Sequence, residues 1–343
     1  MQKSLSYDDV LLVPKYSDIR SRSEINITGD LTNGLSLPLP IISSPMDTIT
    51  ETAMSFVMAC MGGSGIIHRY NTIEEQSKMV REASTEIGSS AIGSLGAAVG
   101  VTGDYIERAQ SLVFAGARYI CVDIAHGHHI LMKEALYNLR KAVPPDFHIM
   151  AGNVASVQGV NDLADWGANS VRCNIGGGSI CSTRIQTGHG MPGLQTIFDC
   201  ARTDRDIGII ADGGIRNAGD IVKALAAGAD AVMCGSLLAG TNEAPGNILK
   251  DASGSYKVYR GMASKEAQIN WRGRYSSFEG ISSVVPCRGN VDSLLTDLEK
   301  NIKSGFSYSG ARNLKQLRLK ADFTQQTTAG TVESGTHIAS KAV

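Results

Sequence analysis

The sequence has no excess of charge of either sign and no long apolar run. Its 32 basic residues are balanced by 33 acidic ones, which gives a formal net charge of −1. Binding to nucleic acid or to an anionic membrane surface usually depends on clustered basic residues. No apolar stretch approaches the roughly 18 residues that a membrane-spanning helix needs. We therefore expect no nucleic-acid partner and no membrane partner, and the composition favours an enzyme that acts on a small molecule.

A paired set of cysteines and a signal peptide are also missing. The seven cysteines are an odd number, and Cys121, Cys173 and Cys234 lie within apolar segments. This usage is typical of reduced thiols in a reducing compartment rather than of a disulfide framework. Within residues 1–18, acidic residues precede any apolar run of signal-peptide length. These features predict a cytoplasmic protein.

Short apolar runs rich in Ile and Val alternate along the chain with segments of helical spacing. Eight strands are expected at Pro40–Ser44, Ser64–His68, Ala91–Leu95, Tyr119–Ile124, Phe147–Gly152, Ser170–Ile175, Ile207–Ala211 and Ala231–Cys234. Seven helices are expected at Glu51–Met61, Thr72–Ala83, Asp104–Ala115, Leu131–Ala142, Gly159–Trp166, Leu194–Ala201 and Gly219–Ala227. Gly116, Gly167 and Gly228 follow three of these helices, at the place where a left-handed residue often ends a helix.

This alternation predicts an α/β protein with a (β/α)8 TIM barrel. Strands that are apolar throughout are buried on both faces, as in a parallel sheet covered by helices. Eight units in series favour a closed barrel over an open doubly wound sheet, and the 343 residues suit one barrel of about 250 residues with insertions. No G-x-x-x-x-G-K-[ST] motif is present, and no G-x-G-x-x-G opens a helix after a strand, which disfavours the P-loop and Rossmann folds.

We expect a single catalytic domain, residues 1–343, with three additions to the barrel. These are an amino-terminal extension over 1–39, an active-site flap of about residues 260–285, and a carboxy-terminal segment over 325–343. Long irregular segments beside a barrel often form lids or interfaces. The segment after Gln325 is rich in Thr, Ser and Gly, and its composition alone favours disorder.

Ligands of TIM barrels bind at the carboxyl ends of the strands, and phosphate is commonly held after strands seven and eight. Those strands are followed by Asp212-Gly213-Gly214 and by Gly235-Ser236. Glycines leave backbone N–H groups accessible to an anion, although they also serve simply to form tight turns. We favour a phosphate site.

Two other strand ends carry reactive side chains. Cys181 lies among glycines after the sixth strand. A lone cysteine is more often a small buried hydrophobe, but a thiol in this position is a candidate nucleophile. The fourth strand is followed by Asp123, His126, His128 and His129. A metal site is one interpretation, but no Cys pair or HExxH helix accompanies these residues, so a polar strand end that positions a substrate is favoured.

A series of longer segments resembles the family of IMP dehydrogenase and GMP reductase. In chain order the segments are SYDDVLLVPKYSD, SSPMDTITE, GGSGIIHRYNTIEEQ, DIAHGHH, AGNV, GGGSICSTR, IADGGIRNAGDI, VMCGSLLAGT and YRGMAS. The resemblance covers nearly the whole chain. It implies a purine-nucleotide oxidoreductase in which a cysteine thiolate adds to C2 of a purine nucleoside monophosphate and a hydride passes between C2 and a nicotinamide cofactor, NAD or NADPH.

The resemblance also implies roles for individual positions. It makes Cys181 the nucleophile, and Thr183 and Glu279 the pair that transfers protons. The implied nucleotide ligands are Ser179, Asp212, Gly214, Gly235, Ser236, Tyr259, Gly261 and Met262. The implied nicotinamide side is lined by Asp123, His126 and Asn153, with Arg172 as a support for the loop.

A homotetramer with bound K+ is a further implication. The ion would be held by Gly176, Gly178 and Cys181 together with Glu333, Ser334 and Gly335 from a neighbouring subunit, which implies an ordered tail. The family's two regulatory CBS repeats are missing, because residues 83–90 lead directly into the third strand. In the cysteine loop, Asn174 and Gly177 stand where the family prefers Gly and Pro, and Ser182 replaces a usual Thr.

The direction of the reaction is indicated differently by different segments. PMDTITE, DIAHGHH, ADGGIRNAGD, GSLLAGT and the tail resemble IMP dehydrogenase, which converts IMP, NAD+ and water to XMP and NADH. The short spacing from Tyr275 to Glu279, and SRSEI at Ser21–Ile25, resemble GMP reductase, which converts GMP and NADPH to IMP and ammonia.

Arg274 and Tyr275 resemble the water-activating pair of the dehydrogenase flap, although a solvated Arg beside a turn Tyr fits equally well. Because loops tolerate deletion, the site motifs favour IMP dehydrogenase. GMP reductase is the alternative. Two further alternatives are more remote. One is an inactive nucleotide-binding paralogue, and the other is an unrelated barrel that acts on a phosphorylated sugar.

Overall fold

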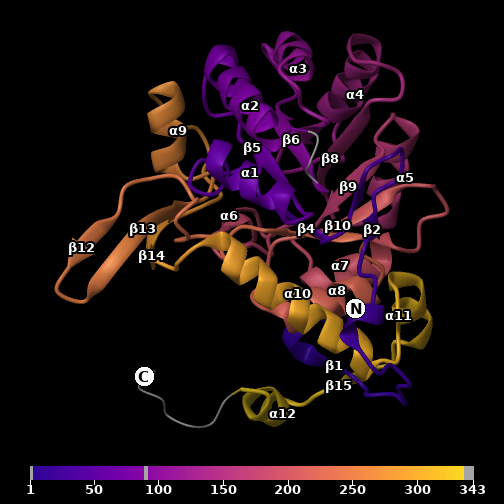
Figure 1. Cartoon of the computed structure of the whole chain (residues 1–343). Coiled ribbons are helices and arrows are strands. Elements are labelled where there is room, and N and C mark those ends of the chain that lie inside the picture. The colour runs from indigo at the N-terminus through magenta and orange to yellow at the C-terminus, as the bar shows by residue number, and fades with distance from the viewer. Residues whose placement is uncertain (1–2, 89–91, 336–343) are drawn as a thin grey trace.

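The computed structural model describes residues 3–88 and 92–335 and contains a closed barrel of eight parallel strands (Figure 1). The strands are β4 (Ile41–Ser43), β5 (Ser64–Ile67), β6 (Ser94–Val99), β7 (Tyr119–Asp123), β8 (His148–Val154), β9 (Ser170–Cys173), β10 (Gly208–Asp212) and β11 (Ala231–Cys234). The predicted (β/α)8 barrel is confirmed. The third strand was expected too early, at Ala91–Leu95, because its apolar run continues through small residues up to Val99; Ala91 itself lies outside the described residues.

Eight helices of the described chain form the outer ring of the barrel. They are α1 (Thr52–Cys60), α2 (Ile73–Ile87), α3 (Tyr105–Phe114), α4 (Ile130–Ala142), α5 (Val157–Asp165), α7 (Gly193–Cys200), α8 (Ala218–Ala226) and α10 (Val291–Tyr308). The first seven confirm the expected helices within a few residues. The seven expected helices did not include α10, which packs between α8 and α1 as the eighth helix of the ring. None of the described helices has the length and apolarity to cross a membrane.

Local sequence explains where these helices begin and end. At the start of α2, the Thr72 hydroxyl accepts a hydrogen bond from the Glu75 N–H at 3.1 Å, and the Glu75 carboxylate accepts one from the Thr72 N–H at 2.9 Å. This reciprocal cap satisfies two of the free N–H groups of the first turn. The expected glycine ends of α3, α5 and α8 are confirmed, since Gly116, Gly167 and Gly228 have φ angles of 106°, 111° and 121°.

The amino-terminal extension closes one end of the barrel. Strands β2 (Gly29–Asp30) and β3 (Ser36–Leu37) form a hairpin whose Leu31, Leu35 and Leu37 are buried. These leucines share a core cluster with side chains from inside the barrel, including Tyr119. The hairpin therefore fills the amino end of the barrel, and ligands have access from the carboxyl ends of the strands.

The two ends of the described chain pair with each other. Strand β1 (Val10–Leu12) is antiparallel to β15 (Phe323–Gln325), which follows α11 (Leu314–Lys320). Beyond β15, helix α12 (Thr328–Glu333) packs against the 3-10 helix η1 (Tyr7–Asp9). The disorder favoured by composition is therefore wrong for this helix, because it is held by tertiary contacts such as the hydrogen bond from the Thr331 hydroxyl to the Asp8 carbonyl at 3.2 Å. Residues 336–343 of the expected tail lie outside the described residues.

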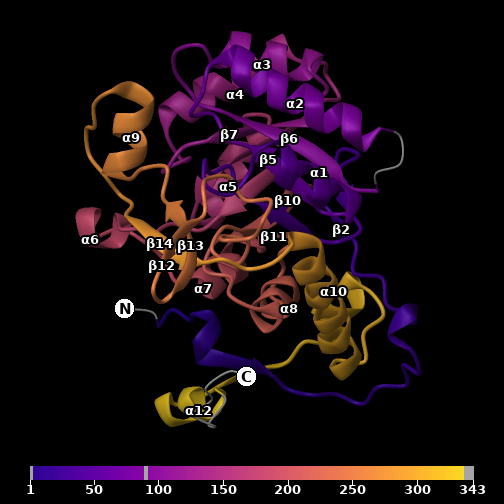
Figure 2. The ribbon, with the colours of Figure 1, turned by 60° about the vertical axis from the view of Figure 1, so that its left-hand side comes forward.

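Between β11 and α10 the chain leaves the barrel and forms the flap. Strands β12 (Leu249–Asp251), β13 (Gly254–Arg260) and β14 (Ser282–Pro286) make a small antiparallel sheet. Helix α9 (Lys265–Arg272) and an irregular loop over 273–281 connect β13 to β14. Figure 2 shows α9 and this sheet as one excursion beside the barrel, which matches the expected flap at about 260–285.

Candidate active site

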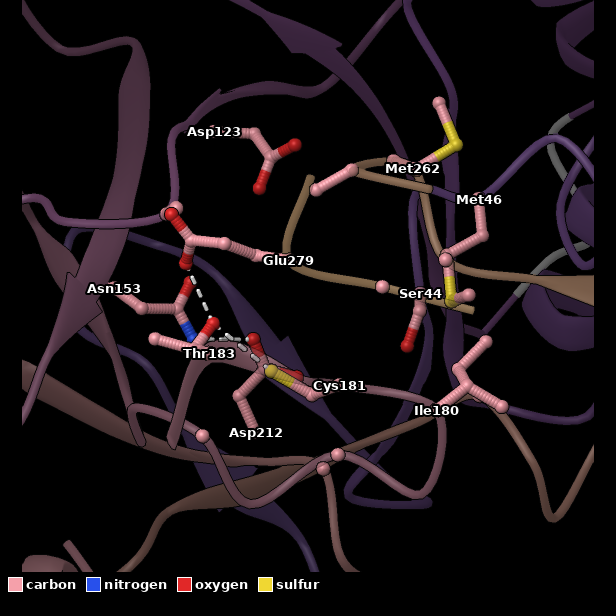
Figure 3. Close-up of a pocket in the computed structure, with 18 of the residues that line it drawn as sticks. Ser44, Met46, Asp123, Asn153, Ile180, Cys181, Thr183, Asp212, Met262 and Glu279 are labelled. Atoms are coloured by element: carbon pink, nitrogen blue, oxygen red, sulfur yellow. Dashed lines mark hydrogen bonds between the residues drawn. The ribbon is translucent and has the colours of Figure 1, made fainter. Parts of the chain in front are cut away.

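A cavity of about 460 Å³ opens at the carboxyl ends of the barrel strands. Its walls come from the ends of β7 to β11, from the cysteine loop after β9, and from the flap. Predicted site residues that line it are Asp123, Asn153, Arg172, Gly176, Gly178, Ser179, Cys181, Thr183, Asp212, Gly214, Gly235, Ser236, Tyr259, Gly261, Met262 and Glu279. The structure therefore brings most of the candidate residues to one place (Figure 3).

Cys181, Thr183 and Glu279 form a continuous line of contacts. The Cys181 Sγ lies 3.1 Å from the Thr183 Oγ1, and the Thr183 hydroxyl donates to the Glu279 carboxylate at 2.6 Å (Figure 3). Thr183 begins the short helix α6 (Thr183–Thr187), whereas Glu279 belongs to the flap. A thiol proton can thus pass through a hydroxyl to a carboxylate, which leaves a thiolate nucleophile.

Backbone hydrogen bonds hold the flap against the cysteine loop. The Ser182 N–H donates to the Glu279 carbonyl at 2.8 Å, and the Ile281 N–H donates to the Ile180 carbonyl at 3.0 Å. The line of side chains is therefore supported on both sides by main-chain contacts. Glu279 and Thr183 are 96 positions apart in the sequence, so this contact depends on the flap folding over the barrel.

Arg172 lies between two carboxylates below the cavity. Its Nη1 is 2.5 Å from the Asp123 Oδ1, and its Nη2 is 2.8 Å from the Asp212 Oδ2. Burial alone would lower the pKa of this guanidinium, but Asp212 and Asp123 outweigh burial and raise the pKa above its ordinary range. Arg172 thus stays charged and fixes both carboxylates, and Asn153 adds a hydrogen bond to Asp212 at 2.7 Å.

The unusual pair in the cysteine loop, Asn174 and Gly177, has a common structural reason. The Asn174 side-chain amide donates to the carbonyl of Asp212 at 2.8 Å and is buried. A Cβ at position 177 would lie 2.2 Å from the Asn174 Nδ2. The asparagine therefore occupies the space that a larger residue at 177 would need, and the two departures compensate each other.

Tyr259 lies beside Gly235, the glycine that follows β11. The Tyr259 hydroxyl lies 3.4 Å from the Ser179 Oγ, and burial raises the pKa of Tyr259 above its ordinary value. A Cβ at Gly235 would come within 3.0 Å of this hydroxyl, and Gly214 has a left-handed φ of 76°. The tyrosine thus remains a neutral hydrogen-bond donor. It lies next to backbone N–H groups that are accessible because glycine has no side chain.

Besides the expected K+ ligands of the tail, three predicted site residues do not line the cavity, namely His126, Arg274 and Tyr275. The exposed His126 contacts His129, with ring centroids 6.4 Å apart. Arg274 and Tyr275 are exposed on the flap, and the Tyr275 ring lies 4.6 Å from the Lys265 ammonium. In this conformation the flap presents Glu279 to the cysteine and turns the Arg–Tyr pair away from it.

The two halves of the expected K+ site belong to different parts of the chain. Gly176, Gly178 and Cys181 lie in the cysteine loop, whereas Glu333 ends α12, which packs against η1. Glu333, Ser334 and Gly335 are not among the residues that line the cavity with the loop. The K+ site thus stays a prediction that requires a second subunit.

Sequence reasoning missed several residues that line the cavity, among them Ser44, Met46, Arg69, Tyr70, Gln268 and Arg272. Met46 and Tyr70 lie within the conspicuous PMDT and HRYN segments, which were a usable sign of their place. A second cavity of about 420 Å³ adjoins the first and shares Arg69, Ile124 and Arg272 with it. The two cavities together offer room for more than one ligand.

A TIM barrel that carries a cysteine at its mouth, linked through a threonine to a flap carboxylate, has the arrangement that nucleophilic catalysis requires. The sequence model described as IMP dehydrogenase / GMP reductase domain matches residues 4–337. The chain belongs to this family of purine-nucleotide oxidoreductases.

Curated relatives from both branches of the family are similar to this chain. An inosine-5'-monophosphate dehydrogenase from Nitrosopumilus maritimus is 34% identical over 469 residues, covering 98% of this chain and 98% of that protein. A GMP reductase from Leishmania major is 31% identical over 482 residues, covering 99% and 98%. Both alignments exceed the 343 residues of this chain, so these relatives hold segments that it lacks, in agreement with the missing repeats.

A solved structure with the same fold is a cysteine-to-alanine variant of GMP reductase from Trypanosoma brucei in complex with guanosine 5'-monophosphate. It superimposes with a TM-score of 0.93 at 30% identity and covers 99% of each chain. The relatives therefore establish the family and leave open which of its two reactions this chain performs.

Proposed function

We propose that this protein reduces GMP to IMP and ammonia with NADPH through a covalent intermediate on Cys181. The carrying observation is the flap, which places Glu279 against Thr183 and Cys181 but leaves Arg274 and Tyr275 exposed. Reduction of GMP requires a proton for the departing amine and no activated water. The geometry thus favours the reductase, whereas the sequence motifs favoured IMP dehydrogenase.

The first step is nucleophilic addition. The Cys181 thiol gives its proton through Thr183 to the Glu279 carboxylate, and the thiolate adds to C2 of GMP. The protonated Glu279 then returns the proton along the same line to the 2-amino group, which leaves as ammonia. This sequence gives a thioimidate between Cys181 and C2.

The second step would replace the C–S bond by a C–H bond. A bound nicotinamide cofactor would supply the hydride to C2, and Cys181 would leave as a thiolate, which releases IMP. Asp123 and Asn153 would line the cofactor side, and Arg172 would hold Asp123 in place. The buried Arg69 Nε lies where the two cavities meet, 4.0 Å from the Asp123 Oδ2, and has no hydrogen-bond partner among the described residues; it would be available to a polar group of that cofactor.

The nucleotide itself would be bound by groups that do not react. Ser179, Gly214, Gly235, Ser236 and Tyr259 offer hydroxyl and backbone donors for the phosphate, as expected for the last two strands of a TIM barrel. Asp212 would accept hydrogen bonds from the ribose hydroxyls. Gly261 and Met262 would contact the base.

A test of the nucleophile uses Cys181→Ala. This variant should bind GMP with an unchanged Kd but lose turnover, because the binding groups lie elsewhere while hydride transfer needs the adduct. Mass spectrometry of the trapped wild-type protein should locate the adduct on Cys181 alone. Turnover close to that of the wild type would remove the proposed mechanism.

IMP dehydrogenase is the second candidate, favoured by the motifs named above and by a relative of 34% identity. In that case NAD+ should be reduced in the presence of IMP with release of XMP, and GMP with NADPH should give nothing. Arg274→Ala should then keep the hydride-transfer burst but slow hydrolysis of the adduct. If the reductase proposal is correct, Arg274→Ala should leave GMP reduction nearly unchanged, whereas Glu279→Gln should slow it about 100-fold or more, the size of a general acid–base effect. Absence of turnover in both directions would favour the inactive paralogue.

Assembly and K+ are tested together. We expect a homotetramer in light scattering and stimulation by K+ over Na+, because an ion bound between subunits stabilises the assembled form. Truncation after Gln325 should abolish the stimulation. A monomer that is indifferent to K+ would contradict this expectation.

A further inference from the structure

Helix α9 of the flap is docked on the barrel rim by an aromatic stack. Trp271, in the last turn of α9, lies on Tyr70 from the loop after β5, with ring centroids 4.2 Å apart and planes inclined by 13°. The Arg69 guanidinium is 5.8 Å from the Trp271 ring, and it donates to the Asp123 carbonyl at 3.2 Å. The carboxyl end of α9 is thus fixed to the same rim that carries Asp123.

One helical turn earlier, Gln268 ties α9 to the loop that precedes Glu279. Its side chain is 5% exposed. Its Nε2 donates to the Ser277 carbonyl at 3.0 Å and to the Ala263 carbonyl at 3.2 Å, and its Oε1 accepts from the Ser276 N–H at 3.4 Å. One amide therefore joins Ala263, which precedes α9, to the loop between α9 and Glu279.

The loop held in this way has little packing of its own. Residues 272–278 are all exposed, and Glu279 is the first side chain after them that turns toward the cavity. The Glu279 N–H donates to the Ala263 carbonyl at 3.1 Å, which Gln268 also contacts. A change in the position of α9 would thus reach the backbone of Glu279. The Glu279 side chain is in turn separated from the Cys181 thiol by two hydrogen bonds, through Thr183.

We propose that Gln268 and Trp271 are positioning residues: Trp271 docks α9 on Tyr70, and Gln268 passes that position to residues 276–279, so that Glu279 stays within hydrogen-bond distance of Thr183. This inference deepens the proposed function, because it assigns to α9 the placement of the group that moves the proton. Misplacement of a reacting group by about 1 Å can cost as much as 100-fold in rate.

The first test measures the pH at which alkylation of Cys181 by iodoacetamide is half-maximal, using peptide mass spectrometry. Glu279→Gln removes a negative charge that disfavours the neighbouring thiolate, and it should therefore move this midpoint downward by about one pH unit. Trp271→Ala and Gln268→Ala should move it in the same direction, and Trp271→Phe should restore it. In the Glu279→Gln background, Trp271→Ala should add nothing, because a residue that acts through another has no separate effect.

The matched control is Glu266→Gln, which changes an exposed side chain on the same helix. Its midpoint should equal that of the wild type, and circular dichroism should show that every variant is folded. A flap that merely opens further would hydrate the thiol and would shift the midpoint in the Glu279→Gln background as well, so the double variant separates that effect from positioning. A midpoint in Trp271→Ala and Gln268→Ala equal to that of the wild type would overturn the proposal, as would a further shift in the double variant.

Turnover gives a second readout. In Trp271→Ala and Gln268→Ala, kcat should fall about tenfold while KM for the nucleotide changes less than about threefold, because the implied phosphate and ribose contacts lie on the barrel. A rise in KM with unchanged kcat would assign both residues to binding and overturn the proposal. If the wild type turns over no purine nucleotide in either direction, the proposed function fails, and the alkylation midpoint still decides the positioning role.

Discussion

Replacement of Arg172 by Met should destabilise the protein strongly at neutral pH. Arg172 is the cation between Asp123 and Asp212, and the three side chains are 8%, 19% and 11% exposed. Methionine keeps most of the volume but leaves Asp212 without its cationic partner and leaves Asp123 with Arg69 alone, whose Nε is 4.0 Å from the Asp123 Oδ2. Removing one member of a buried ionic cluster costs about 3–5 kcal/mol. Because both carboxylates retain some contact with solvent, we expect the lower end, about 3 kcal/mol.

The corresponding change in Tm follows from the size of the chain. Unfolding of 343 residues at about 2.1 cal/mol/K per residue gives an entropy of about 0.7 kcal/mol/K. A loss of about 3 kcal/mol therefore lowers Tm by about 4 °C. Urea unfolding followed by circular dichroism, with calorimetry alongside, measures both quantities.

A second variant makes the prediction sharper. The double variant Arg172→Met with Asp212→Asn should be more stable than Arg172→Met alone, since it removes the carboxylate charge that has lost its ion pair. If Arg172→Met lost less than about 1 kcal/mol at pH 7.5, or if the second substitution destabilised it further, the charge argument would be refuted.

Three further predictions concern stability. Burial lowers the pKa of His148 to about 4. Between pH 6.5 and 4 its imidazole therefore stays neutral in the folded protein, whereas in the unfolded chain it binds a proton below about pH 6.5. The free energy of unfolding should therefore fall by up to about 3 kcal/mol as pH drops from 6.5 to 4, and His148→Gln should flatten this slope; an unchanged slope would contradict the assignment. Leu37→Ala should lower the free energy of unfolding by about 2–5 kcal/mol without changing kcat, because it leaves a cavity in the core at the amino end of the barrel, far from the site. Leu319→Ala changes an exposed side chain and should lower it by less than about 0.5 kcal/mol. Gly228→Ala places a Cβ 2.4 Å from a neighbouring Cβ, while Gly103→Ala meets nothing within 4 Å. Urea unfolding should thus show a larger loss for Gly228→Ala than for Gly103→Ala, and equal losses would count against the close approach.

Local sequence was sufficient to predict the strand–helix repeat of the barrel and much of the candidate active site. The run Tyr119–Asp123 and the capped segment Ile73–Ile87 form their elements because periodic burial and end capping are properties of neighbouring residues. The glycines after α3, α5 and α8 could be assigned in the same way. Cys181 and Thr183 are two positions apart, so their place in one loop followed from the strand before them.

Contacts between distant segments followed from no local pattern. Helix α10 was missed because 56 residues separate it from β11 and interrupt the repeat. Only barrel closure decided that Arg172 would meet Asp123 and Asp212, since the ends of β7, β9 and β10 come together when the sheet curves. Likewise, only the folded flap shows that Glu279 rather than Arg274 meets the Thr183 hydroxyl, because the direction of an exposed loop depends on the surface against which it folds. The sequence by itself determined which residues could react; the tertiary structure decided which of them meet.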